Sequence, residues 1–324
     1  MAEKKHSTLA LLEILTTNTD EDHILTTRQL LDLLKTQYDL DIERRTLYSN
    51  LAILEQAGYK ISRYEDNGKG YFLEEKQFDK GEILLLCNAI HASHYISDKQ
   101  STLLIKKLLK TLSKYEANEF KGNVYMPNPQ KTLNSELMYN ISLISEAIRD
   151  HKMIQFTYNR YNNQKQMVPR REEPYLVEPR YIVYADSRPY LIATNKKYYN
   201  FTHYRIDRIN KAFLIDEAVK PLPKEIDAYE YAKNKLFMYG DDMEPVTFLC
   251  DNRIMDHMID LFGPDVLIAP QNEESFMLRT TTSKTGALFL AQQFLDSIQI
   301  MEPKELRKEF KKRLETTLKQ YQSK

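Results

Sequence analysis

The 324-residue chain contains no tryptophan and only two cysteines. Cys87 and Cys250 each lie in an apolar context without a neighbouring Cys or His at metal-ligand spacing. We therefore expect buried, reduced thiols, and neither a disulfide nor a zinc site. No apolar run reaches the roughly 18 to 20 residues that cross a bilayer, and the start of the chain leads into no apolar signal-peptide core. These features predict a cytoplasmic protein.

Signatures of catalysis are also missing. The sequence has no Walker-type phosphate loop, no Gly-x-Ser-x-Gly and no His-Glu-x-x-His. His91 and His94 are three apart in a predicted helix, but no nearby Asp or Glu completes a metal set, so we expect packing or solvated roles. We predict no enzyme activity, no metal and no cofactor. The alternative is a nucleotide hydrolase.

Net charge is zero, with 46 Lys and Arg against 46 Asp and Glu, but the charges are unevenly distributed. Residues 1–80 hold 11 cations and 15 anions, a net charge of −4, whereas residues 150–220 hold 13 and 8, a net charge of +5. A nucleic acid bound by the first segment would therefore depend on locally placed cations. The positive middle segment requires a separate explanation.

Three helices are predicted at the start of the chain. The first is an apolar helix around residues 9–15, and the second follows Thr26-Thr-Arg-Gln29, which has capping-box spacing. The third runs from Asp41, a plausible N-cap, to Gly58, with leucines at helical spacing. Centred on those leucines, a helical wheel places four residues away from the core: Arg45, Tyr48, Ser49 and Ala52.

A hairpin-like sequence, residues 61–73, follows the third helix. Asn67-Gly68 is a strong tight-turn signal between two short alternating runs. Helix, helix, helix, hairpin is the order of a winged helix, whose third helix enters the major groove. Arg45 could pair with guanine O6 and N7, and the other predicted DNA contacts are Arg44, Thr46, Tyr48 and Ser49 on the helix, with Arg63 and Lys69 on the wing. The alternative is an ordinary solvated surface.

Residues 79–120 are predicted to be helical, with more apolar positions than so short a segment can bury alone. A second copy of the chain is the simplest partner, which predicts a homodimer. Residues 121–135 contain Gly122, Pro127, Pro129 and several Asn, and this composition is typical of a linker.

One helix at residues 137–150 and a series of short strands up to about residue 215 suggest a small Sm-like or SH3-like β-barrel. After Pro221 and Pro223, the predicted order is βαββαβ, which suggests an antiparallel ferredoxin-like domain followed by an amphipathic helix. The predicted fold class is multidomain α+β.

Two motifs in the middle segment resemble the WYL domain of bacterial transcriptional regulators. Ser187-Arg-Pro-Tyr190-Leu191-Ile-Ala resembles the motif that names the family, with Pro189 in place of its usual Trp. Thr202-His-Tyr-Arg205-Ile-Asp207-Arg208-Ile209 resembles its Arg-x-Asp-Arg-Ile signature. The resemblance covers almost the whole chain and implies four segments: a winged helix-turn-helix at 1–78, a helical linker and dimerisation region at 79–136, a WYL domain at 137–222 and a C-terminal extension at 223–324.

The family resemblance implies a DNA-binding transcriptional regulator whose barrel senses an effector, which is a nucleic acid or nucleotide in several members. A guanidinium suits phosphate because it donates to two oxygens at once. One of Arg205 and Arg208 could contact a phosphate while the other pairs with Asp207 or a nearby Glu. Arg180, Tyr190 and His203 could complete a pocket for bases. The main alternative is a nucleic-acid-binding protein without effector control.

Overall fold

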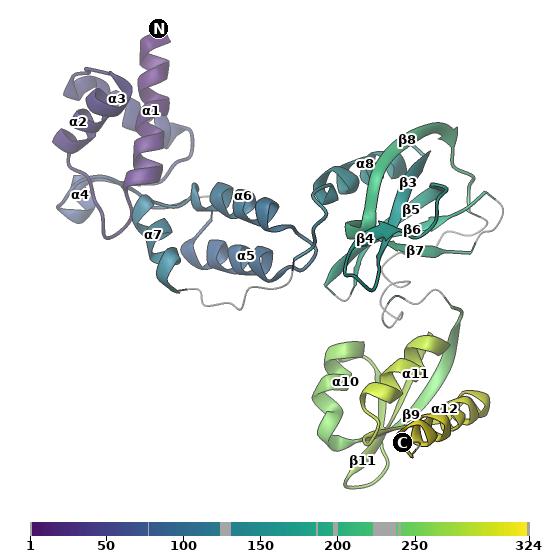
Figure 1. Ribbon diagram of the computed structural model, residues 1–324. Helices are drawn as coiled ribbons and strands as arrows, with labels where there is room; N and C mark the ends of the chain where they lie inside the picture. The colour runs from purple at the N-terminus through teal and green to yellow at the C-terminus, as the bar shows by residue number, and fades with distance from the viewer. Residues whose placement is uncertain are drawn as a thin grey trace. The chain divides into compact units, whose positions relative to one another are not determined.

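The computed structural model describes residues 2–76, 78–123, 131–185, 187–196, 200–222, 238 and 241–322. The chain divides into two compact units, residues 1–135 and 136–324 (Figure 1). It is a mixed α+β protein with helices at the N-terminus, a curled antiparallel sheet in the middle and an α/β region at the C-terminus. The predicted linker at 121–135 and the boundary at 223 fall partly outside the described residues.

The first unit begins with three helices, α1 (Ala2–Asn18), α2 (Thr27–Tyr38) and α3 (Arg44–Gln56). Their leucines form one core with Tyr71 and Leu73. The capping box predicted for α2 is present, since Thr26 accepts from the Gln29 backbone and the Gln29 side chain accepts from Thr26. Burying one face of each helix in this core is the main source of helical stability here.

The predicted N-cap of the third helix, Asp41, was wrong by two residues. The N-cap is Glu43, which makes no side-chain capping bond. Asp41 instead pairs with Lys35, with 2.7 Å between Oδ2 and Nζ. A carboxylate that neutralises a neighbouring lysine satisfies its charge as well as a cap would, and spacing alone does not distinguish the two. The C-terminal prediction is confirmed, because the helix ends just before Gly58, whose φ of +96° is the left-handed region that favours glycine.

The hairpin prediction also needs correction. The strands β1 (Ile61–Ser62) and β2 (Phe72–Leu73) pair antiparallel, but each has only two residues, and the connection contains a helical turn, α4 (Tyr64–Asn67). Gly68, with φ +67°, ends that turn and does not sit in a tight hairpin. Gly70 is required for another reason: a Cβ there would lie 2.3 Å from the carbonyl oxygen of Leu25, which bridges Tyr71.

Three more helices complete the first unit, namely α5 (Lys80–Ala92), α6 (Asp98–Leu109) and α7 (Lys114–Asn123). They confirm the predicted helical segment. Ile83, Cys87 and Leu112 form a small core. Four leucines of these helices stay exposed, as expected for a segment that cannot bury its own apolar surface: Leu84, Leu85, Leu86 and Leu103.

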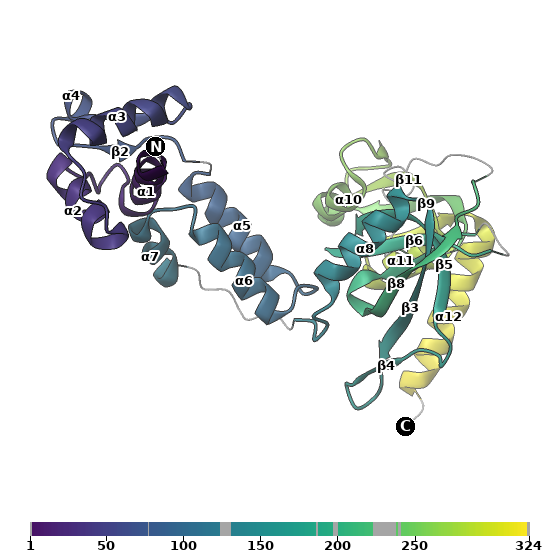
Figure 2. The same ribbon diagram turned by 90° about the horizontal axis from the view of Figure 1, so that it is seen from above.

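The middle of the chain folds as helix α8 (Leu137–Arg149) against a curled sheet of six strands (Figure 2). The strands are β3 (Lys152–Tyr161), β4 (Met167–Pro169), β5 (Tyr175–Ala185), β6 (Arg188–Thr194), β7 (Thr202–Arg205) and β8 (Ile209–Ala218). The sheet order is β4-β3-β5-β6-β7, and β8 pairs with β3. Sequence patterns predicted all of these strands except β4, which is only three residues long.

The C-terminal region has the predicted βαββαβ order. It comprises β9 (Met243–Asp251), α10 (Met255–Phe262), β10 (Leu267–Pro270), β11 (Ser275–Ser283), α11 (Lys284–Gln293) and β12 (Ile298–Glu302). All pairings in its sheet, of order β10-β11-β9-β12, are antiparallel. The long helix α12 (Lys304–Gln322) follows, and its first half contributes Leu306 and Phe310 to the core of this region. In the described residues no helix is long and apolar enough to cross a membrane.

Candidate nucleic-acid interface and effector site

Helix α3 presents its polar face to solvent because its leucines are committed to the core. Leu47, Leu51 and Leu54 are buried. Asn50 is polar but also buried, because both ends of its amide bond to α1. Its amide nitrogen donates to Ser7 Oγ at 2.9 Å, and its amide oxygen accepts from Thr8 Oγ1 at 3.0 Å. These bonds attach α3 to α1 and fix the rotation of the outer face.

The predicted DNA contacts of α3 lie on this outer face. Arg44, Arg45 and Tyr48 are exposed, and Ser49 is half-buried. Residues at the start of the helix line a hollow of about 590 Å³, with Asp41, Glu43, Arg45, Thr46 and Ser49 among them. Neither Arg44 nor Arg45 forms an ion pair within the described part of the chain. Both guanidinium groups are therefore available to an external partner.

The two predicted wing cations differ. Arg63 forms a two-pronged ion pair with Glu55 of α3, with 2.7 Å between Nε and Oε1. Glu55 hydrogen-bonds Arg63 and thereby raises the pKa of the guanidinium. Lys69 is exposed, and its ammonium makes no ion pair among the residues described. Arg63 thus holds the β1–β2 segment against α3, and Lys69 is the one of the two cations whose charge has no ion-pair partner in the described residues.

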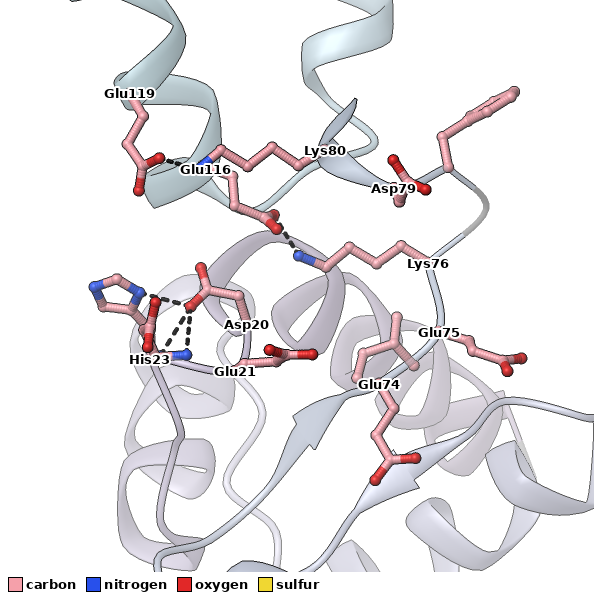
Figure 3. A pocket seen from close by; sticks show the side chains of 13 residues that line it. Asp20, Glu21, His23, Glu74, Glu75, Lys76, Asp79, Lys80, Glu116 and Glu119 are labelled. Atoms are coloured by element: carbon pink, nitrogen blue, oxygen red, sulfur yellow. Dashed lines mark hydrogen bonds and ion pairs between the residues drawn. The ribbon is translucent and has the colours of Figure 1, made fainter. Parts of the chain in front are cut away.

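An acidic pocket of about 440 Å³ lies in the first unit between the loop after α1, the segment after β2, and α7 (Figure 3). Ser113 donates to Asp20 at 2.5 Å, and Asp20 also lies 2.7 Å from Nδ1 of His23. Lys76 pairs with Glu116 of α7 at 2.5 Å, and Lys80 pairs with Glu119. Among the residues described, no group of His, Cys, Asp and Glu could hold a metal ion. The hydrogen bonds and ion pairs around this pocket form a polar joint that attaches α7 to the three-helix core.

Hydrogen bonding decides the charge of the central carboxylate in this joint. Burial alone would raise the pKa of Asp20, but hydrogen bonds from Ser113 and His23 lower it, and the net pKa lies below its usual range. His23 also stacks on Tyr115 of α7, with 3.6 Å between ring centroids. No local sequence pattern indicates this joint, because its partners are about 90 residues apart.

In the curled sheet, strand register brings three of the predicted effector residues to one face. Tyr190 of β6 is directly opposite Arg205 of β7, and Ile192 is opposite His203. Directly paired residues point to the same side of a sheet, and so do residues two apart on a strand. Tyr190, His203 and Arg205 therefore share a face. Tyr190 is itself buried, in a cluster with Val183 and Ile192.

The arginines of the predicted effector site are held to different degrees. Arg205 forms a bidentate pair with Asp207, at 3.0 and 2.6 Å. Arg180 is only 8% exposed and pairs at 3.0 Å with Glu178, which is 1% exposed and also accepts from Thr194. Arg208 differs, because its buried Nε has no hydrogen-bond partner among the described residues. Of the three, only Arg208 has a buried donor nitrogen without a partner in the part of the chain that the structure describes.

An aromatic cluster that was not among the predicted site residues lies beside these arginines. The rings of Phe156, Tyr158, Tyr175 and Tyr204 contact one another at centroid distances of 5.2 to 6.4 Å. The exposed Arg171 lies 3.7 Å above the Tyr175 ring. Alternating aromatic residues in β3, at positions 156 and 158, are the signal that could have indicated this cluster.

Burial dominates the electrostatics of the aromatic cluster. It raises the pKa of Tyr204 to about 12. It also raises the pKa of Tyr158, although the nearby charges of Arg208 and Arg205 act in the opposite direction. The Tyr158 hydroxyl accepts a hydrogen bond from the Arg205 backbone N–H at 3.2 Å. The signature arginines and this aromatic cluster therefore meet near the end of β7.

A sequence model of the WYL domain matches residues 139–214, from α8 into β8. The chain contains a WYL domain. Both motifs lie within that match, on β6, β7 and the turn that follows. Pro189 is buried, and it stands where the motif that gives the domain its name has Trp. The WYL domain of this chain thus has Arg205, Asp207 and Arg208 together at the end of β7.

Similarity beyond the WYL domain is distant. No curated protein matches the sequence. Among solved structures, proteasome accessory factor B/C (PafBC) of Arthrobacter aurescens is 18% identical, with a TM-score of 0.28, and the match covers 98% of this chain and 49% of that chain. A CRISPR Cas-related protein is 12% identical, with a TM-score of 0.37, covering 99% of this chain and 85% of that one. This chain spans about half the length of the PafBC chain.

Proposed function

We propose that the chain is a dimeric, DNA-binding transcriptional regulator, in which α3 reads the major groove and the WYL domain binds a nucleic-acid or nucleotide effector. The single observation that carries the proposal is the outer face of α3, where Arg44, Arg45 and Tyr48 are exposed on a helix that buried hydrogen bonds fix to α1. With β1 and β2 following it, the arrangement has the order of a winged helix.

The charge distribution supports DNA binding at this face. The segment is acidic overall, so a general positive field does not draw it to DNA. A free arginine can recognise guanine through two hydrogen bonds, and a free lysine such as Lys69 can neutralise a phosphate. The affinity should fall with salt, with a slope of about 0.9 per phosphate neutralised.

Dimerisation is proposed through the exposed leucines of α5 and α6, with a second copy as the partner. Leu85 is 70% exposed and Leu103 is 52% exposed. Sedimentation velocity tests the proposal directly: Leu85→Glu with Leu103→Glu should convert a dimer to a monomer. The matched control is Leu133→Glu, because Leu133 is 79% exposed and lies outside these helices. A monomeric wild-type chain, or a double variant that stays dimeric, would contradict this interface.

The effector proposal depends on Arg208 more than on the other arginines. A phosphate near the end of β7 could satisfy the buried Nε of Arg208 and also approach Arg205. Short single-stranded oligonucleotides and nucleotides should be titrated against the DNA complex. An effector is expected to change DNA affinity by about 5- to 150-fold, the usual range of allosteric coupling. In Arg208→Gln that change should disappear, whereas Arg160→Gln, which removes an exposed cation of β3, should preserve it.

A nucleic-acid-binding protein without effector control is the second candidate. It is favoured by the observation that Glu178 and Asp207 already neutralise Arg180 and Arg205. If no nucleotide or oligonucleotide changes the DNA affinity over a wide concentration range, this second candidate replaces the first.

The ferredoxin-like identity of the C-terminal region is proposed on its βαββαβ order and antiparallel pairing.

A further inference from the structure

The C-terminal region contains a basic groove that neither the DNA-reading helix nor the WYL domain uses. It has a volume of about 910 Å³ and lies between the sheet and the first turns of α12. Five of its lining residues are cations, and one is an anion, Glu302. The cations are Arg279, Lys304, Arg307, Lys308 and Lys311.

The sheet side of the groove is the face opposite the hydrophobic core. Thr247 of β9 pairs directly with Arg279 of β11, so the two side chains point to the same side. Their neighbours Phe248 and Leu278 are buried in the core and point to the other side. Arg279 is exposed, and it forms no ion pair within the described part of the chain. This arginine therefore presents its charge to the groove.

The helix side of the groove is a stripe of positive charge. Lys304, Arg307, Lys308 and Lys311 are spaced at i, i+3, i+4 and i+7, which places them on one face of α12. All four are exposed. Lys311 has a distant partner, Glu315 at 3.9 Å, and Arg307 contacts the Met301 sulfur at 3.6 Å.

This stripe opposes the stability of its own helix. Cations in the first turns lie at the positive end of the helix dipole, and like charges four residues apart repel each other. Glu305, which also lies in the first turn, offsets part of this repulsion, whereas Glu309 pairs instead with Lys284 and Arg313. A bound anion would relieve both unfavourable terms.

Charge in this region is segregated. Residues 241–322 hold 10 Lys and Arg against 14 Asp and Glu, a net charge of −4. Half of those cations line the groove, whereas only one of the fourteen anions does. General basicity therefore does not explain the groove. The positive charge has been concentrated where an anionic ligand would lie.

We infer that this groove binds the phosphodiester backbone of a nucleic acid without reading its bases. From Lys304 to Lys311 the stripe extends about 10.5 Å at 1.5 Å per residue, which equals the rise of about three nucleotides along the axis of a B-form duplex, at 3.4 Å each. None of the described residues lining the groove is aromatic, so it offers no ring on which a base could stack. A row of dispersed cations on a long, exposed surface suits a chain of phosphates better than one small anion.

The test compares two pairs of lysines on the same helix in the full-length protein. Lys304→Gln with Lys308→Gln removes two charges from the groove. The matched control is Lys312→Gln with Lys319→Gln, which removes two exposed charges of α12 that do not line it. In a parallel series, the wild-type chain and both lysine variants should also carry Arg45→Ala and Tyr48→Ala, so that binding by α3 does not mask binding by the groove.

The probe is a random-sequence 30-base-pair DNA duplex, with single-stranded DNA, RNA and polyglutamate as comparisons, measured between 50 and 200 mM salt. The groove variant is expected to bind all three nucleic acids more weakly. Its salt slope on the duplex should be lower by about 1.8, so that its affinity for the duplex falls roughly tenfold less over this range. The control pair should keep the wild-type slope.

Three results would overturn the inference. Equal losses in the two lysine pairs would show a response to net charge alone. An unchanged slope in the groove variant would show that the groove does not contact phosphates. Polyglutamate binding as tight as DNA binding, and lost in the groove variant, would identify an acidic peptide as the ligand. Because the series without Arg45 and Tyr48 is measured separately, failure here is distinguishable from failure of DNA reading by α3.

Discussion

The arginines of α3 and those of the WYL domain differ in their exposure and in their ion pairing. Arg44 and Arg45 are exposed and have no ion-pair partner among the described residues, whereas Arg180 and Arg205 are largely buried against Glu178 and Asp207. A free guanidinium can pair with a new partner at once, but a paired one must first lose its carboxylate. The two regions teach that a basic motif predicts a ligand contact only when the structure leaves its charge unpaired.

The largest expected effect comes from breaking the most buried pair. Glu178→Gln leaves the Arg180 charge buried without a counter-charge, and we expect a loss of about 3 kcal/mol in the stability of the WYL domain. The measurement is the urea dependence of amide hydrogen exchange in β5 and β6. As a control, Asp216→Asn removes the exposed partner of Lys152 and should leave that exchange unchanged. Equal exchange in the two variants would mean that the Arg180–Glu178 ion pair does not stabilise the domain.

The second-largest effect is expected at Arg45 of α3, whose guanidinium has no ion-pair partner among the described residues. Arg45→Ala should weaken binding to the selected DNA site by about 1 to 3 kcal/mol, the discrimination given by one bidentate arginine–guanine contact. Binding to random DNA should change much less, and the ratio of the two affinities is the quantity to measure. Lys107→Ala, which removes an exposed cation of α6, is the control. If both substitutions lower the two affinities alike, Arg45 contributes charge and not recognition.

A smaller effect concerns the joint between α7 and the three-helix core. The folded-state pKa of Asp20 lies below its usual value of 3.8, so its contribution to stability is present above that pH and is lost as the pH falls through the lower, folded value. Amide exchange near residues 20–23 and 113–116 should therefore accelerate in acid below about pH 4. In Asp20→Asn this acid-dependent step should be absent, and its persistence there would assign the step to another carboxylate.

The smallest effect is expected at the thiols. Burial raises the pKa of Cys250 to about 12 and also raises that of Cys87. Little thiolate should form in the folded protein, so reaction of Cys250 with a disulfide reagent should follow unfolding of the C-terminal region. The rate in urea is the measurement. Rapid labelling of Cys250 at neutral pH without denaturant would contradict its burial.

Sequence patterns predicted the secondary structure well because most elements bury one regular face. The leucine spacing of α3, the capping box of α2 and the alternation in β9 and β11 each report local packing. The errors occurred where a polar group had two possible local partners. Asp41 pairs with Lys35 and does not cap α3, and Asn67 ends a helical turn where a tight hairpin was expected.

Site residues were harder to predict than elements. The sequence predicted that one of Arg205 and Arg208 pairs with an acid, but only the fold shows that it is Arg205, that the Nε of Arg208 has no partner in the described residues, and that Arg180 is paired as well. The basic groove could not be predicted either. It combines Arg279 with a stripe that starts 25 residues later, and the register of β11 and the position of α12 bring them together.

The most direct test of the central claim is a selection of bound genomic DNA fragments by the wild-type protein and by Arg45→Ala with Tyr48→Ala. We predict that the wild-type protein enriches a sequence with two half-sites separated by about 10 base pairs or a multiple, as a dimer of groove-reading helices requires. The folded double variant should enrich no such sequence. Enrichment of the same sequence by both proteins would contradict DNA reading by α3.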